Sequence, residues 1–370
     1  MIPLNQNLTP LKRSPIRLYT NMAREIPDCA MLTIGEPDFD TPEEIKRAAV
    51  AALQANQTHY APNQGTMALR EKIAAVEQVR PEQVLVTIGA TQALFTALLG
   101  ILNPGEEVIV PTPGFMLYET IVTIAGAKLV PLDVSKTGFQ IDPDALNALI
   151  TPKTKAIVLN SPCNPTGTVL NETSLAAVKK AVLGKDIFVV CDNVYRGLSY
   201  GPCPDLGKDP ELQDQLIICQ SFSKPWAMTG WRIGYLICPE YVMERLLLLS
   251  AAEIAAVPTF LQEAAIEALC TEPADMKETY RKRRDYVCAR LDAMGLTYPK
   301  PEGAFYVFPN IAKFGMDSAT FCTRMIREAK AAAVPGGCFG ADDHIRLSYC
   351  YSEAELKKGL DRMEAFLNIL

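Results

Sequence analysis

Residues 216–238, LIICQSFSKPWAMTGWRIGYLIC, contain two apolar runs separated by a polar segment. The runs LIIC (216–219) and IGYLIC (233–238) are apolar throughout rather than alternating, which is typical of strands covered on both faces of a sheet. Lys224 follows the first run, and Arg232 directly precedes the second. Because a charged amine beside a buried strand costs free energy, we expect a group there that uses the amine of Lys224.

Similar apolar runs recur between about residues 80 and 240, where segments with helical periodicity alternate with them. QVLVTIG (83–89) leads into TQALFTALLGIL (91–102), and KAIVLNSP (155–162) leads into ETSLAAVKKAVL (172–183). Strand and helix in alternation indicate a mostly parallel sheet with right-handed crossovers. The sequence therefore predicts an α/β domain.

The pattern changes after Ile237. A long helical region reaches to about Cys270, a charged amphipathic helix covers 275–295, and short strands and helices follow. These features predict a smaller α+β domain joined to the first by the long helix. We expect an N-terminal arm (1–40) that joins the small domain, a large ligand-binding domain (41–272) and the small domain (273–370).

Composition excludes several classes of function. A net charge of −6 argues against nucleic acid or an anionic membrane as partner, and the longest apolar segment (246–270) carries three glutamates, so it is no bilayer span. The first fifteen residues lack the apolar core of a signal peptide, and the eleven cysteines form no C-x-x-C pair. With two histidines, neither a metal site nor a Ser-His-Asp hydrolase is expected. We expect a cytoplasmic protein with reduced thiols.

Polar residues follow the predicted strands at their carboxyl ends, where ligands bind in open α/β sheets. Ala90 and Thr91 begin a helix after one strand, and backbone N–H groups at a helix start attract anions. Ser221, Ser223 and Arg232 add hydroxyl and guanidinium donors that suit a phosphate. The sequence therefore predicts a phosphate site at this edge.

Lys224 and Asp192 bring reactive groups to the same edge. A lysine amine in a desolvated site forms a Schiff base with an aldehyde, and a carboxylate can keep a pyridine nitrogen protonated. Asn164 and Tyr195 can hydrogen-bond a ring oxygen, and Phe115 can stack on the ring. An aldehyde, a ring and a phosphate on one ligand describe pyridoxal phosphate.

Eight motifs, in order over nearly the whole chain, carry a resemblance to a known family. The sequence resembles the class I/II aminotransferases of pyridoxal phosphate fold type I, and is most similar to the bacterial group with aspartate, aromatic and N-acetyl-diaminopimelate aminotransferases. That family combines a large domain, whose mostly parallel central sheet is flanked by helices, with a smaller α+β domain. The motifs are IGEPDFDTP (34–42), YAPNQGTMALR (60–70), GATQALF (89–95), SPCNPTG (161–167), CDNVY (191–195), SFSKPWAMTGWRIGY (221–235), KPEGAFYVFP (300–309) and IRLSY (345–349).

The resemblance implies a role for each matching residue. Lys224 would form the Schiff base and move the proton between the substrate α-carbon and the cofactor. The substrate α-carboxylate would bind Arg346, helped by Asn164 and the backbone of Gly35, and Tyr60 would reach the phosphate of a neighbouring subunit in a homodimer. The remaining cofactor contacts would be Asp192 at the pyridinium, Asn164 and Tyr195 at the ring oxygen, Phe115 on the ring face, and Ala90, Thr91, Ser221, Ser223 and Arg232 at the phosphate.

The amino donor stays open at this point, and the resemblance makes aromatic and N-acetyl-diaminopimelate-like amino acids the first candidates. The helix after Gly89 has no lysine where some acidic-substrate members place one, which argues against aspartate, while Arg17 in the arm either reads a distal carboxylate or is solvated. Tyr19 and Phe339 are expected near the substrate pocket and favour an aromatic donor. Asn193 stands where the family often has an acidic residue, and we expect it to change the charge around the site rather than cofactor binding.

Three readings compete with an aminotransferase that works in two half-reactions by a ping-pong mechanism. A carbon–sulfur β-lyase would use the same Lys224 step but expel a thiol. A regulator would carry a helix-turn-helix segment, for which the chain leaves no room before the arm SPIRLY (14–19), and it would need a basic patch. A catalytically inactive homologue would have little reason to keep Lys224, Asp192, Tyr195 and Arg346 together, since burying them without a ligand destabilises the fold.

Overall fold

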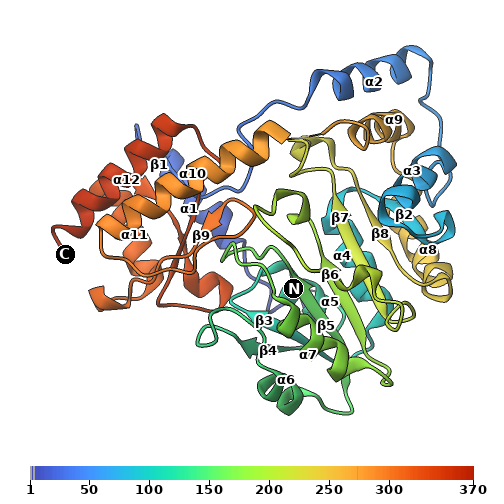
Figure 1. Ribbon diagram of the computed structural model, residues 1–370, viewed down its shortest axis with the longest axis horizontal. Helices are drawn as coiled ribbons and strands as arrows, with labels where there is room; N and C mark the ends of the chain where they lie inside the picture. Colours follow the sequence, from blue (N-terminus) through green and yellow to red (C-terminus); the bar gives the residue numbers. More distant parts are fainter. Residues whose placement is uncertain (1, 3–4, 273) are drawn as a thin grey trace.

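A seven-stranded sheet forms the centre of the larger part of the protein (Figure 1). The computed structural model describes residue 2, residues 5–272 and residues 274–370. The strand order is β2-β8-β7-β6-β5-β3-β4, and neighbours run parallel except for β8, which is antiparallel to both β2 and β7. The predicted mostly parallel α/β sheet is confirmed. The strands are β2 (Val84–Thr87), β3 (Glu107–Thr112), β4 (Lys128–Asp133), β5 (Thr154–Asn160), β6 (Phe188–Asp192), β7 (Leu216–Ser221) and β8 (Gly234–Ile237).

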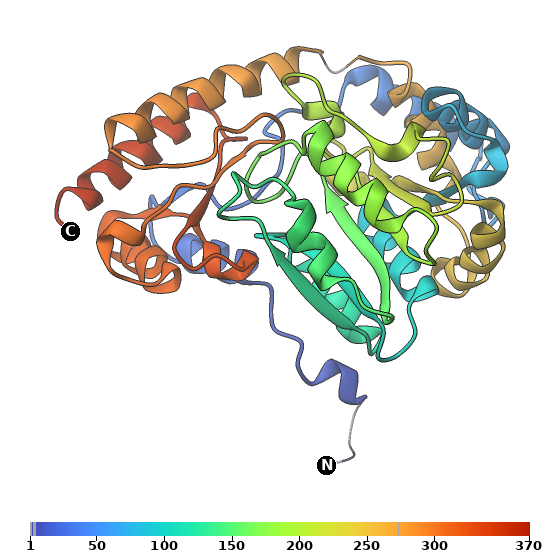
Figure 2. The ribbon, with the colours of Figure 1, turned by 60° about the horizontal axis from the view of Figure 1, so that its bottom comes forward.

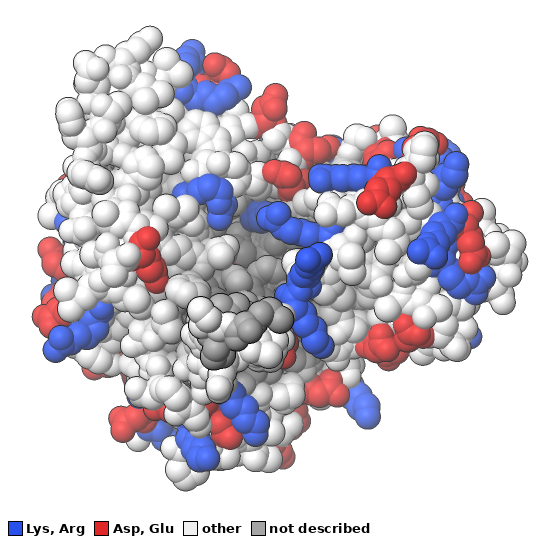
Figure 3. All heavy atoms as spheres, turned by 180° about the vertical axis from the view of Figure 1, so that it is seen from behind, with Lys and Arg blue, Asp and Glu red and all other residues white. Residues whose placement is uncertain are grey.

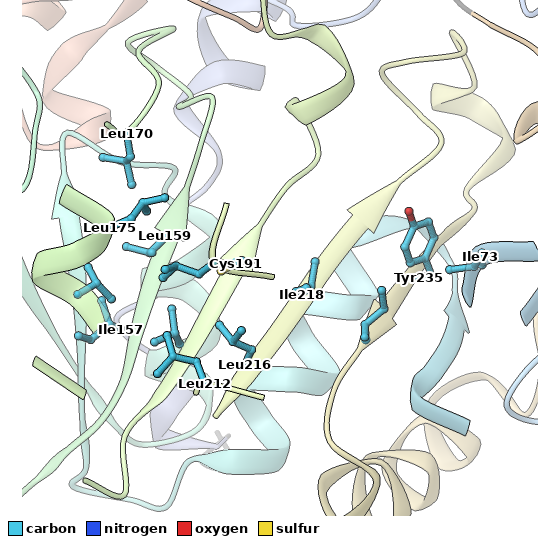
Figure 4. Close-up of a cluster of buried hydrophobic side chains, with 14 of the residues drawn as sticks. Ile73, Ile157, Leu159, Leu170, Leu175, Cys191, Leu212, Leu216, Ile218 and Tyr235 are labelled. Atoms are coloured by element: carbon cyan, nitrogen blue, oxygen red, sulfur yellow. The ribbon is translucent and has the colours of Figure 1, made fainter. Parts of the chain in front are cut away.

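Both faces of this sheet are buried, which explains why the strands are apolar throughout. In β5, Ile157 and Leu159 enter one core and Ala156 and Val158 enter another, because successive side chains point to opposite faces. Figure 4 shows Ile157 and Leu159 beside Leu175 in the first core. Helices α2 (Glu43–Gln54), α3 (Met67–Glu77), α6 (Pro143–Leu149), α7 (Glu172–Val182) and α9 (Thr259–Ala268) contribute to the first core, and α4 (Gly89–Ile101), α5 (Leu117–Ile124) and α8 (Glu240–Ile254) to the second.

The smaller part of the protein has a core of its own, to which both ends of the chain contribute. Near the N-terminus, β1 (Ala30–Met31) pairs in parallel with β10 (Ala331–Ala332). A second sheet has the order β11-β12-β9 and is antiparallel. The other elements are α1 (Pro15–Arg24), β9 (Tyr306–Val307), α11 (Ser318–Ala329), β11 (Val334–Pro335), β12 (Ile345–Ser348) and α12 (Glu353–Leu367).

The long helical region expected up to Cys270 consists of two helices, α8 and α9. Ala255 takes a left-handed φ of +57°, and Pro258 occupies the N-cap of α9. A proline has no N–H to continue a helix and restricts the residue before it, so the break follows from Pro258. No helix in the described part of the chain is long and apolar enough to cross a membrane.

We propose that the chain divides into the arm, large domain and small domain expected from the sequence. The separate cores and the β1–β10 pairing support this division. Helix α10 (Ala274–Ala293) runs between the two parts (Figures 1 and 2). Residue 273, where the small domain is expected to begin, lies outside the described residues.

Candidate active site

A cavity of about 250 Å³ lies at the carboxyl ends of the central strands, as expected for an open α/β sheet. Figure 3 shows one face of the protein, which is hollowed between its two parts and has Lys and Arg side chains along the rim of the recess. Twelve residues singled out from the sequence line the cavity: Gly35, Ala90, Thr91, Phe115, Asn164, Asp192, Tyr195, Ser221, Ser223, Lys224, Arg232 and Arg346.

One end of the cavity collects donors for an anion. Helix α4 begins at Gly89, and no side chain caps its first turn, so its backbone N–H groups face the cavity end without a side-chain partner. Gly89 has a left-handed φ of +69°, and a Cβ there would lie 2.7 Å from the guanidinium of Arg232. Glycine thus lets Arg232 approach the helix start. Ser221, the last residue of strand β7, and Ser223 line the same cavity.

Lys224 also lines the cavity. Its Nζ donates a hydrogen bond to the backbone oxygen of Gly35, at 2.6 Å. Burial lowers the pKa of the Lys224 ammonium from 10.5 to about 8, while nearby Cys350 and Glu36 act in the opposite sense. A large fraction of this amine is therefore neutral near pH 8, and a neutral amine can attack a carbonyl carbon.

Asp192 ends strand β6 and is 3% exposed. Its Oδ2 accepts a hydrogen bond from the hydroxyl of Tyr118 at 2.7 Å, and its Oδ1 accepts one from the backbone N–H of Val194 at 3.3 Å. Burial raises the pKa of Asp192 from 3.8 to about 6, and the two hydrogen bonds oppose that rise. The carboxylate is ionised at neutral pH, so it can pair with a protonated ring nitrogen.

Two tyrosine hydroxyls meet beside the aspartate. The hydroxyls of Tyr195 and Tyr306 are 2.8 Å apart, and both side chains are buried. A Cβ on Gly35 would lie 1.7 Å from the Tyr306 hydroxyl, so only glycine fits there. Burial raises the pKa of Tyr306 to about 12, which keeps its hydroxyl protonated in the physiological range.

Arg346 is 1% exposed and lies on strand β12. Its Nη1 donates to Oδ1 of Asn164 at 2.8 Å, and its Nη2 donates to the backbone oxygen of Thr33 at 2.5 Å. The guanidinium carbon is 4.4 Å from the ring centre of Tyr306 and 5.1 Å from that of Phe339. No carboxylate of the described residues pairs with it, and a buried guanidinium of this kind suits an incoming carboxylate.

Four residues expected at or near the site do not line the cavity. Tyr60 is 93% exposed, and Arg17 is exposed on α1, although its neighbour Ile16 lines the cavity. Tyr19 and Phe339, which we expected near the substrate pocket, are the other two. The Tyr19 hydroxyl donates to the backbone of the small part, at Ala319, and Phe339 lies against Arg346.

Sequence reasoning missed Tyr118, Tyr306 and Asn160. Tyr118 lies in helix α5, and the Asn160 amide donates to the backbone oxygen of Asp192 at 2.9 Å. Tyr306 lies in the motif KPEGAFYVFP and Asn160 ends strand β5, whereas Tyr118 has neither signal. Asn193 is buried, and it lines a separate small cavity with Cys203 and other residues rather than the site itself.

The donors around the cavity fit the parts of pyridoxal phosphate. Hydroxyls, a guanidinium and a helix start lie at one end for a phosphate, and Lys224 lies within reach of an aldehyde. Asp192 provides one buried carboxylate for a ring nitrogen, and Tyr195 provides a hydroxyl for a ring oxygen. The set of residues therefore matches the chemistry of this cofactor.

Comparison with known proteins gives the same family. Residues 27–363 match the family model of aminotransferase class I and II. A probable N-acetyl-LL-diaminopimelate aminotransferase of Bacillus subtilis is 38% identical, over 98% of this chain and 95% of the relative. An aspartate aminotransferase of Pyrococcus abyssi is 37% identical, over 98% of both chains, and an aromatic-amino-acid aminotransferase of Thermococcus litoralis is 36% identical, over 98% of both.

A solved structure shares the whole fold. The aspartate aminotransferase of Thermus thermophilus, solved with maleate, is 37% identical, covers 100% of both chains and superimposes with a TM-score of 0.94. The relatives are aminotransferases, and nothing in them points to the carbon–sulfur lyase alternative. Because sequence and fold agree over almost its full length, the chain belongs to the class I and II aminotransferases, which are enzymes that use pyridoxal phosphate to exchange an amino group between an amino acid and a 2-oxo acid.

Proposed function

We propose that this aminotransferase takes its amino group from a neutral L-amino acid with an apolar or aromatic side chain. The supporting observation is the set of cations at the cavity. Among the described lining residues, only Lys224, Arg232 and Arg346 carry a positive charge, and cofactor and α-carboxylate require all three. The other lining side chains are neutral except Asp192, and apolar ones such as Ile16 and Leu117 are among them. A second carboxylate would have no cation to pair with, and its desolvation would be costly.

Lys224 is the proposed proton carrier. When bound, pyridoxal phosphate supplies an aldehyde carbon and a ring that withdraws electrons from the substrate. The neutral amine of Lys224 would accept the proton from the substrate α-carbon and hold it for return to the cofactor. The hydrogen bond from Lys224 to the oxygen of Gly35 holds the amine at this place.

Asp192, Tyr195 and Asn164 position the ring in this proposal. The ionised carboxylate of Asp192 keeps the ring nitrogen protonated, and Tyr118 and Val194 hold that carboxylate in place. Asn164 shares its amide between the ring oxygen and Arg346. Phe115 covers one face of the ring, while Ala90, Thr91, Ser221, Ser223 and Arg232 hold the phosphate.

Arg346 grips the α-carboxylate of both substrates in turn. A planar guanidinium that is already held by Asn164 and Thr33 loses little freedom when it binds. The donor and the 2-oxo acid share this group, so one arginine serves both half-reactions of a ping-pong cycle.

A homodimer completes the proposed site. Tyr60 is 93% exposed on a single chain, which suits a residue that reaches the phosphate of the neighbouring subunit. Leu53, Met67 and Leu248 are exposed apolar side chains of the large domain that a partner would cover. Light scattering should then give twice the chain mass of 40.5 kDa. The eleven free thiols support a reducing compartment, the cytoplasm.

A panel of amino donors tests the substrate proposal. With one 2-oxo acid held constant, kcat/KM for L-phenylalanine should exceed that for L-aspartate by about a hundredfold, since the second carboxylate of aspartate would be desolvated without a cation to pair with. The matched variant Arg17→Gln should leave that ratio unchanged. A preference for aspartate that Arg17→Gln abolishes would show instead that the arm reads a distal carboxylate.

A further inference from the structure

Tyr306 lies where two parts of the site meet. Its strand β9 pairs with β12, which carries Arg346, so the backbone register places the tyrosine ring beneath the guanidinium, 4.4 Å from its carbon. The hydroxyl at the other end of the ring is 2.8 Å from that of Tyr195. Tyr306 therefore touches both the arginine that takes the carboxylate and the tyrosine that takes the ring oxygen.

The direction of the hydrogen bond between the two hydroxyls follows from their partners. Tyr195 has one hydroxyl proton, and donating it to the ring oxygen leaves only its lone pairs for Tyr306. Within the described part of the chain, the Tyr306 hydroxyl has no other hydrogen-bond partner. Tyr306 must then donate to Tyr195, and a chain of two donors points at the ring oxygen.

We propose that Tyr306 is a positioning residue that strengthens the hydrogen bond of Tyr195 to the cofactor through its hydroxyl and orients Arg346 through its ring. This inference rests on the roles proposed above for Tyr195 and Arg346. Gly35 contributes to the same positioning, because any larger residue there would displace the Tyr306 hydroxyl.

The variant Tyr306→Phe removes the hydroxyl and keeps the ring. When the ring oxygen is less well stabilised, the neighbouring cofactor-bound nitrogen of Lys224 holds its proton more tightly. The pH midpoint of the visible absorption change of the holoenzyme should therefore rise. The loss of one hydrogen-bond donor acting through another predicts a shift of about half a pH unit, a threefold change in the proton affinity. Affinity for the unreactive carboxylate 3-phenylpropionate should not change, because the ring still supports Arg346.

The variant Tyr306→Leu removes both the hydroxyl and the ring. It should show the same shift of the pH midpoint and, in addition, bind 3-phenylpropionate about fivefold more weakly, since the contact between guanidinium and ring is lost. Tyr200→Phe is the matched control. Tyr200 is a partly buried tyrosine next to this segment, its hydroxyl donates to the backbone oxygen of Ala304, and it does not line the cavity. Neither readout should move in that variant.

Tyr195→Phe separates failure of this inference from failure of the proposed function. If Tyr195→Phe leaves the pH midpoint unchanged, the proposed role of Tyr195 is wrong and the inference falls with it. If Tyr195→Phe raises the midpoint and Tyr306→Phe does not, only the inference is overturned. The double variant should shift no further than Tyr195→Phe alone, because Tyr306 acts through Tyr195. Additive shifts of the pH midpoint would show that Tyr306 does not act through Tyr195. Gly35→Ala provides a second variant, because it displaces the Tyr306 hydroxyl without removing it, and the pH midpoint should rise in that variant too.

Discussion

Replacing Asp192 by asparagine should stabilise the cofactor-free protein at pH 7.5 while weakening its affinity for pyridoxal phosphate. Asp192 is 3% exposed, and burial raises its pKa from 3.8 to about 6. The folded protein therefore binds the proton of the Asp192 carboxyl group more tightly than the unfolded chain does. Between about pH 4 and pH 6 the folded state carries more protons, so this group makes the free energy of unfolding fall as the pH rises through that window.

The size of the effect follows from the pKa. A carboxyl group whose folded pKa lies about two units above its unfolded value costs about 3 kcal/mol once it is ionised. Asparagine is neutral and has nearly the same shape, but it cannot accept from both Tyr118 and the N–H of Val194, which costs about 1 kcal/mol. The net gain for Asp192→Asn is about 2 kcal/mol above pH 7, falls to about 0.6 kcal/mol at pH 5 and reaches zero near pH 4.5.

Urea unfolding of both apoproteins, at equal protein concentration and at pH 5 and 7.5, measures this difference. Other groups titrate in both proteins and cancel, so the difference between the variants isolates Asp192. With cofactor, the order should reverse, because wild type gains the ion pair with the ring nitrogen and the variant does not. A stability difference that is the same at both pH values would refute the assigned pKa. Equal affinity of wild type and Asp192→Asn for pyridoxal phosphate would refute the proposed pairing of Asp192 with the ring nitrogen.

Three further predictions concern the rest of the site. Lys224→Ala should abolish amino transfer below detection but still bind the cofactor, measured by dialysis and absorbance, because the phosphate donors remain. The rate at which the apoprotein takes up pyridoxal phosphate should rise about tenfold per pH unit and level off near pH 8, since only neutral Lys224 attacks the aldehyde; a rise that continues past pH 10 would contradict its lowered pKa. Arg346→Lys should raise KM for donor and 2-oxo acid alike by about a hundredfold, as the bidentate pair is lost; an effect on one substrate only would show that they bind different groups.

The sequence predicts the large sheet and most of the cavity because both depend on local patterns. Apolar runs mark strands buried on two faces, and the polar residues that follow them reach the same edge wherever the strands are parallel. Asp192 and Ser221 could be placed at the site on that ground alone. The residues at the ends of β5, β6 and β7 do line one cavity.

The supporting contacts could not be predicted, because they join residues far apart in the chain. Tyr118 lies 74 positions from Asp192, and Tyr306 lies 111 positions from Tyr195. A tyrosine in an apolar run has the same pattern whether its hydroxyl meets a carboxylate or a backbone oxygen. Tyr19 shows the opposite error, since a residue close in sequence to Ile16, which lines the cavity, turns instead to the small domain.

One half-reaction tests the central claim most directly. L-Phenylalanine is added to purified holoenzyme without any 2-oxo acid, and the visible spectrum, phenylpyruvate and ammonia are followed together. The account predicts loss of the visible band of the Lys224-bound cofactor, one phenylpyruvate per chain and no ammonia. A visible band that does not respond to phenylalanine would contradict the donor assignment. Release of ammonia, or a protein that binds no pyridoxal phosphate, would contradict amino transfer at Lys224.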